Sequence, residues 1–175
     1  MLWLQNYAAS HPISVVRYKV SDMILQIHAD SSQLSFRRAY IRSCGYHYLS
    51  DTSDDPPNNR SISTICKIVG NVMKSAAEEK IGSTYINAQD AIPLQTYLIN
   101  MGNPQPPTNI KIYNTTVEAF YKVTLHQKIL KSIDMCFYWL QNHKIQGQFN
   151  IFWRPGKDKI GVITKPSIIT RATTA

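Results

Sequence analysis

The strictest constraint on the fold is an alternating stretch near the N-terminus. From Met23 to Asp30, apolar residues alternate with a set that contains Gln26, His28 and Asp30. This two-residue period predicts a β-strand with one face wetter than the other. It places Asp30 at the carboxyl end of the strand, on the same face as Gln26 and His28. Asp30 is then either an exposed strand end or one ligand of a metal site.

Further elements follow in an order typical of a mixed α/β domain. Residues 40–49 and 63–69 are strand candidates, separated by a polar loop at 50–59. A helix begins at Ser75, its candidate N-cap, and Pro93 is expected to kink or divide it. Then come a strand at 110–113, helices at 115–121 and 128–144, and a strand at 148–153. This order predicts a mixed sheet with helices packed on it.

Composition narrows the class of protein. With 175 residues, of which 43% are hydrophobic, the chain can build the core of one globular domain. It has neither a secretory signal nor an apolar run of about 18 residues, so we expect an intracellular protein without a membrane span. Its three cysteines are far apart and odd in number, which favours buried free thiols. The formal charge of +8 favours a polyanionic partner such as nucleic acid.

Four motifs, taken in order, resemble the ribonuclease H domain that follows reverse transcriptase in copia-type retrotransposon polyproteins. They are IHADSSQLS, which contains Asp30; SAAEEK at 75–80; IYN at 112–114; and KSIDM at 131–135 with the later segments GQ, WRP and TKP. The resemblance covers residues 1–166. It implies a ribonuclease H-like mixed five-stranded sheet flanked by helices. It also divides the chain into a connection segment at 1–20, a ribonuclease H-like domain at 21–166 and a tail at 167–175.

The resemblance further implies an activity. Enzymes of this family cut the RNA strand of an RNA:DNA hybrid with two divalent cations, Mg²⁺ or Mn²⁺. Two such cations repel each other, so the site needs several clustered carboxylates. A basic surface beside it binds the phosphates of the hybrid. Four basic residues are candidates for that surface here: Lys122, Lys128, Lys131 and Arg154.

The candidate catalytic residues depart from the family pattern. Asp30 matches the first family carboxylate and is the candidate metal ligand, and Glu78 retains the first acid of the second motif. Lys80 stands where the family has its metal-binding glutamate. Tyr113 and Val162 stand where the family has its third and fourth acids. One of the four metal-binding acids therefore remains, and we expect impaired catalysis.

Three functions stay open on these residues. The first is a degenerate ribonuclease H-like domain that retains hybrid binding. The second is an active metal-dependent nuclease, in which Glu78 or Glu79 together with Asp158 replaces the lost acids. The third is a protein-interaction module that uses a sheet edge or the basic face. We expect a monomer in each case.

Overall fold

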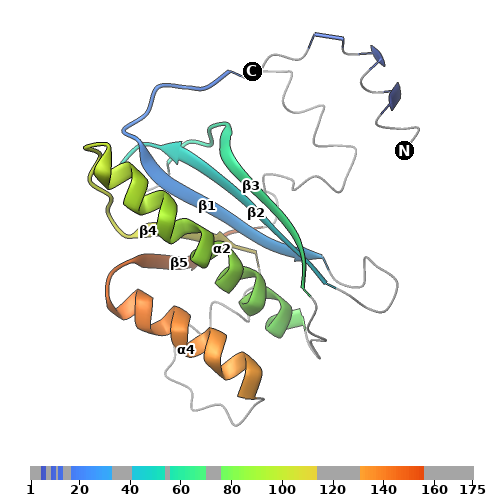
Figure 1. Ribbon diagram of the computed structural model, residues 1–175. Helices are drawn as coiled ribbons and strands as arrows, with labels where there is room; N and C mark the ends of the chain where they lie inside the picture. The colour runs from blue at the N-terminus through green and yellow to red at the C-terminus, as the bar shows by residue number, and fades with distance from the viewer. Residues whose placement is uncertain are drawn as a thin grey trace.

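The computed structural model describes residues 5–6, 9–10, 12–13, 17–32, 41–53, 56–69, 76–113 and 131–155. Within this part of the chain, a mixed five-stranded sheet carries two helices on one face (Figure 1). The expected α/β class, a mixed five-stranded sheet flanked by helices, is confirmed. In the ranges described, no helix is long and apolar enough to cross a membrane.

The elements follow one another as β1 (Ile24–Ser32), β2 (Ile41–Ser50), β3 (Ser61–Val69), α2 (Ala76–Asn100), β4 (Thr108–Ile112), α4 (Lys131–Ile145) and β5 (Phe149–Trp153). The strand order in the sheet is β3-β2-β1-β4-β5. β2 pairs antiparallel with both β1 and β3, whereas β4 pairs parallel with both β1 and β5. β1 is therefore the central strand, with the antiparallel half of the sheet on one side and the parallel half on the other.

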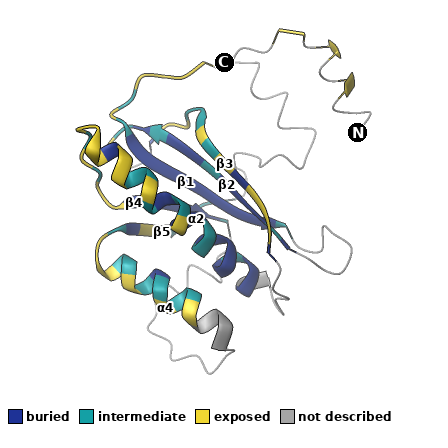
Figure 2. Cartoon of the chain, in the orientation of Figure 1, coloured by how far each residue is buried: buried dark blue, intermediate teal, exposed yellow. Residues whose placement is uncertain are grey.

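The two faces of β1 have different chemistry. Leu25, Ile27 and Ala29 join the hydrophobic core under α2 and α4, as the alternation predicts. The polar face was expected to be wetter, but Gln26 and His28 are each only 2% exposed. Figure 2 shows β1 as buried along nearly its whole length. The polar face is thus a second interior layer.

Residues 56–60 help to bury that polar layer. The Tyr46 hydroxyl donates to the backbone oxygen of Asn59 at 2.8 Å, and the Ser50 hydroxyl donates to that of Pro57 at 2.5 Å. Asn59 in turn donates through Nδ2 to the backbone oxygen of Leu49 at 3.0 Å. These bonds hold the end of the β2–β3 connection against the sheet.

The hydrophobic core lies between the sheet and the two helices. Its buried members come from five elements: Leu25, Ile27, Ala29, Ile81, Ala88, Ala91, Leu98, Ile110, Ile112, Leu140, Phe149 and Ile151. Trp139 packs at the margin of this cluster, with its ring centroid 5.1 Å from that of Tyr85 and 6.3 Å from that of Phe149. These core contacts fix α2 over β1, and they therefore set the position of the first turns of α2.

Several predicted boundaries need correction. α2 runs unbroken from Ala76 to Asn100, so the expectation that Pro93 divides it is wrong. Pro93 is exposed, and the lost backbone hydrogen bond is tolerated because Ala88, Ala91 and Leu98 hold the opposite side of the helix in the core. β1 and β2 end at Ser32 and Ser50, slightly later than predicted. The predicted helix at 115–121, the start of the predicted helix at 128–144 and Ser75 lie outside the described residues.

Candidate functional site

The candidate site lies where β1 and β4 end beside the first turns of α2. β4 is parallel to β1, with His28 opposite Lys111. Continuing this register by two residues brings Asp30 and Tyr113 to the same end of the sheet. α2 adds Lys80 from its first turns. The sheet and helix therefore gather three of the positions at which the sequence analysis expected site residues: Asp30, Lys80 and Tyr113.

Lys80 and Asp30 form an ion pair at this point. The Lys80 ammonium donates to Asp30 Oδ1 and, at 2.7 Å, to the backbone oxygen of Ser31. The Asp30 side chain is 9% exposed and the Lys80 side chain 17%. The interpretation of Asp30 as an exposed strand end is therefore wrong, because the helix and its lysine cover the carboxylate. The Lys80 ammonium thus contacts the carboxylate. Position 80 is the one at which the sequence pattern led us to expect a metal-binding glutamate.

Polar contacts at successive turns of α2 fix this geometry. The Ser83 hydroxyl donates to the backbone oxygen of Asp30 at 2.5 Å and is 2.9 Å from the hydroxyl of Ser43. One turn later, Asn87 Nδ2 donates to the backbone oxygen of Cys44 at 3.2 Å. Residues 80, 83 and 87 follow helical spacing, so one face of α2 docks on β1 and β2. The direction of the Lys80 side chain follows from this docking.

Gly45 makes the close approach of α2 possible. A Cβ at this position would stand 1.6 Å from Asn87 Oδ1, far inside van der Waals contact. The same amide oxygen is 3.1 Å from Nε2 of His47, which is opposite Ile27 and therefore on the side of the sheet that faces the helices. Because Oδ1 only accepts, Nε2 of His47 carries the hydrogen. Glycine is therefore required at 45 by a hydrogen-bonded side chain packed against the strand.

His28 occupies the centre of the polar layer beneath the site. Its Nδ1 contacts the Tyr113 hydroxyl, and its Nε2 lies 3.2 Å from Asn58 Oδ1 and from the Tyr48 hydroxyl. Asn58 Oδ1 only accepts, so Nε2–H donates to it and Nδ1 accepts from Tyr113. Burial, followed by the positive charge of Lys111, lowers the pKa of His28 to about 3. His28 is therefore neutral at physiological pH, and its hydrogen bond with the Tyr113 hydroxyl fixes that side chain at the site.

Lys111 brings a second cation to the polar layer. It is 4% exposed and donates to the Tyr48 hydroxyl at 3.1 Å. It lines a cavity of about 250 Å³ together with His28, Asn58, Tyr113, Arg154 and the prolines at 56 and 57. No pattern in the sequence singled out Lys111, because a lone lysine in a five-residue strand does not differ from a surface lysine. Positive charge thus lies both at Lys80 and in the cavity that Tyr113 lines.

Divalent metal ions do not fit the residues described at this site. Glu78 and Glu79 are buried in the first turn of α2. Within the described part of the chain, however, no group of three or more His, Cys, Asp or Glu residues could hold a metal ion. A cation bound at Asp30 would also meet the Lys80 ammonium. At ~4 Å and an effective dielectric of 20, that repulsion is about 4 kcal/mol for each positive charge of the metal.

The remaining candidates have separate outcomes. Arg154 is described: its backbone N–H donates to Ile112 at 2.9 Å, and its guanidinium lies 5.4 Å from the centre of the Phe152 ring. Lys122, Lys128, Asp158 and Val162 lie outside the described residues. Lys131 is the first residue of α4, and the structure describes its backbone but not its side chain.

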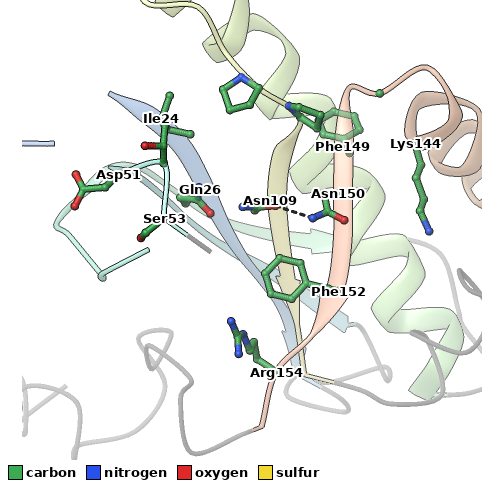
Figure 3. Close-up of a pocket in the computed structure, with 14 residues that line it drawn as sticks. Ile24, Gln26, Asp51, Ser53, Asn109, Lys144, Phe149, Asn150, Phe152 and Arg154 are labelled. Atoms are coloured by element: carbon green, nitrogen blue, oxygen red, sulfur yellow. Dashed lines mark hydrogen bonds between the residues drawn. The ribbon is translucent and has the colours of Figure 1, made fainter. Parts of the chain in front are cut away.

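Arg154 also lines a larger groove on the sheet face that the helices leave open. This groove, about 670 Å³, crosses β1, β4 and β5 and is bordered by residues 51–53 (Figure 3). The ring of Phe152 lines it beside the amides of Gln26, Asn109 and Asn150, whereas Phe149 borders it but is 2% exposed and belongs to the core. Lys144 and Arg154 supply positive charge and Asp51 negative charge. Basic and aromatic groups thus share one concave surface.

Comparison with known proteins extends the description of the fold. The solved structure of LC11-RNase H1, isolated from compost by a metagenomic approach, is similar with a TM-score of 0.55 and 8% identity, over 78% of this chain and 87% of that one. The structure of the same enzyme in complex with an RNA/DNA hybrid is similar with a TM-score of 0.54 and 8% identity, over 77% of this chain and 87% of that one. The N-terminal RNase H domain of Rv2228c from Mycobacterium tuberculosis is similar with a TM-score of 0.53 and 12% identity, over 77% of this chain and 89% of that one.

The likeness at these identities concerns the fold, and the sheet and helices described here have the ribonuclease H fold. No family model matches the sequence, and no curated protein matches it.

Proposed function

We propose that this chain binds RNA:DNA hybrids without hydrolysing them, as a degenerate ribonuclease H-like domain derived from a copia-type retrotransposon polyprotein. The proposed domain spans residues 21–166, acts as a monomer inside the cell and requires no Mg²⁺ or Mn²⁺. The carrying observation is the ion pair between Lys80 and Asp30. It neutralises Asp30, the one carboxylate that matches a metal-binding acid of the family pattern.

Three further observations support hybrid binding. A solved protein of similar fold is in complex with an RNA/DNA hybrid. The net charge of +8 attracts polyanions, and Lys144 and Arg154 border a groove that is also lined by the aromatic ring of Phe152. In this proposal the phosphates of the hybrid contact Arg154 together with Lys122, Lys128 and Lys131.

The loss of hydrolysis rests on charge. Two-metal hydrolysis needs carboxylates that hold the ions, activate water and stabilise the leaving oxygen. At two of the expected positions the chain offers an ammonium, on Lys80, and a phenol, on Tyr113. A phenol with a reference pKa of about 10 is a poor ligand for Mg²⁺ at neutral pH. The Tyr113 hydroxyl is in addition already bonded to His28.

One experiment tests both parts of this proposal. A labelled RNA:DNA hybrid is incubated with the full chain in Mg²⁺ or Mn²⁺, and binding is measured over a range of salt concentrations. We expect intact hybrid and an affinity that falls as salt rises. Cleavage that disappears in Asp30→Asn would show an active nuclease and overturn the proposal. Failure to bind hybrid at low salt would also overturn it and favour the protein-interaction module.

Surface variants locate the contact. Arg154→Gln should weaken hybrid binding several-fold and reduce the salt dependence by about one phosphate contact. Lys67→Gln is the matched control. Lys67, on the edge strand β3, is paired with Asp90 on α2 and lines neither the cavity nor the groove. Equal loss of affinity in both variants would mean that Arg154 acts only through the overall charge of the protein.

A further inference from the structure

Two cysteine thiols face each other across neighbouring strands. Cys44 on β2 is directly opposite Cys66 on β3 in the antiparallel register. Both are free thiols, and the Cys66 thiol is close enough to Cys44 to raise the pKa of the Cys44 thiol. Directly opposite residues have Cα atoms about 4.5 or 5.5 Å apart, depending on the type of pair. Both distances fall within the range of about 4.4–6.8 Å that a disulfide spans.

The two thiols differ in their access to solvent. Cys44 is 3% exposed, whereas Cys66 is exposed on the edge strand of the sheet. Burial, together with the neighbouring Cys66, raises the pKa of Cys44 to about 11. Cys44 is therefore protonated at neutral pH and shielded, and a dissolved oxidant meets Cys66 first. The pair thus has one accessible thiol and one adjacent thiol that can resolve its oxidation product.

We propose that Cys44 and Cys66 form a reversible cross-strand disulfide, with a hydroperoxide as oxidant. In the first step the Cys66 sulfur attacks the peroxide: an S–O bond forms, the O–O bond breaks, and water or an alcohol leaves. In the second step the Cys44 sulfur attacks the Cys66 sulfenic acid. The S–S bond forms, the S–O bond breaks, and the departing hydroxide takes the Cys44 proton as water. A dithiol reverses the reaction by exchange and is itself oxidised.

The position of this disulfide gives it consequences for the fold. The register places Asp30, Cys44 and Cys66 in one row across β1, β2 and β3. Oxidation would attach the edge strand β3 covalently to β2, one strand away from the Lys80–Asp30 pair. The modification depends only on the two thiols and so stands independently of hybrid binding.

The test is oxidation of the full chain by hydrogen peroxide, followed by mass spectrometry under denaturing conditions. We expect a monomer that loses the mass of two hydrogens and two of its three thiols, with the linked peptides containing Cys44 and Cys66. Reduction with a dithiol should restore all three free thiols. Cys136→Ser should behave like the wild type in forming the link, whereas Cys66→Ser should form none.

A second variant keeps the result decisive. In Cys44→Ala the sulfenic acid of Cys66 has no neighbouring thiol, so a cyclic 1,3-diketone should trap it in higher yield than in the wild type. Should this variant fail to fold, the wild type and Cys66→Ser still decide the question, since Cys66 is exposed. Three thiols retained in the oxidised wild type, or a Cys66-linked dimer in place of the internal link, would overturn the proposal.

Discussion

The Lys80 ammonium on α2 and the Asp30 carboxylate at the end of β1 join two elements whose residues are fifty positions apart in the chain. The pair is largely buried, and the same ammonium also bonds the backbone of Ser31. A buried ion pair contributes little over an apolar pair of the same shape, but removal of one partner leaves a charge that the protein solvates poorly. The pair is therefore a point at which stability depends on two charges being kept together.

Lys80→Met should destabilise the protein by about 2–4 kcal/mol, because the Asp30 carboxylate stays buried without its cation. Lys67→Met is the matched control: its partner is Asp90, and their side chains are 58% and 38% exposed. It should lose less than about 1 kcal/mol. Urea denaturation of both variants checks this. Equal losses would mean that solvent screens Asp30 as well as it screens Asp90.

Lys80→Glu should convert the ion pair into two facing carboxylates. Their repulsion should lower the melting temperature in the absence of divalent ions, and Mn²⁺ or Mg²⁺ should raise it again. The wild type should show no such ion-dependent rise, and neither should Lys67→Glu. The double variant Lys80→Glu with Asp30→Asn should lose the rise. Thermal denaturation with and without each ion gives the answer, and an ion effect that persists without Asp30 would place the cation elsewhere.

His28 should make stability depend on pH. Its folded pKa of about 3 lies below the reference value of 6.5, so between these values the unfolded chain binds a proton that the folded chain does not. The free energy of unfolding should therefore fall as pH drops from about 6.5 towards 3, by up to about 4 kcal/mol from this residue. His28→Gln should show a shallower fall over the same interval. Parallel curves for the two proteins would contradict the burial of a neutral His28.

Gly45→Ala should destabilise the protein by about 2–3 kcal/mol. The added methyl group displaces Asn87, which loses its bonds to His47 and to the backbone of Cys44. A double-mutant cycle with Asn87→Ala separates this cause from a general effect on the strand. Because Asn87→Ala removes both the collision and the bonds, the double variant should be less destabilised than the sum of the single ones. Strict additivity would show that Gly45 and Asn87 act independently.

The sequence predicted the strands and the long helix where periodicity was strong. Alternation at 23–30 gave β1 to within two residues, and the motif at 75–80 placed the start of α2. Of the two effects predicted for Pro93, a kink or a division of the helix, the division is wrong. Proline removes one hydrogen bond, whereas the packing of an entire helix face decides whether the helix continues. The prediction of buried thiols is confirmed for Cys44 alone, since Cys66 is exposed and Cys136 is half-buried. Spacing along the chain does not reveal which strand lies at the edge of the sheet or which side of a helix faces solvent.

The site was predictable in its positions but not in its contacts. The motifs indicated that Asp30, Lys80 and Tyr113 belong together, and the register of β1 and β4 agrees. That Lys80 would pair with Asp30 rather than turn to solvent depends on the docking of α2 through Ser83 and Asn87. Such docking comes from contacts between residues about forty to fifty positions apart, which a local pattern does not contain. The functional roles of Asp30, Glu78 and Arg154 stay predictions.

The Lys80–Asp30 pair also sets a stability cost on building an acidic cluster at this point of the fold. A single change to glutamate at position 80 places two carboxylates face to face before any further ligand of a metal ion is present. The Tyr113 hydroxyl meanwhile remains engaged with His28. An acid introduced at 80 alone would thus lower stability before the site could hold a metal ion, so a metal-binding cluster here requires several substitutions together.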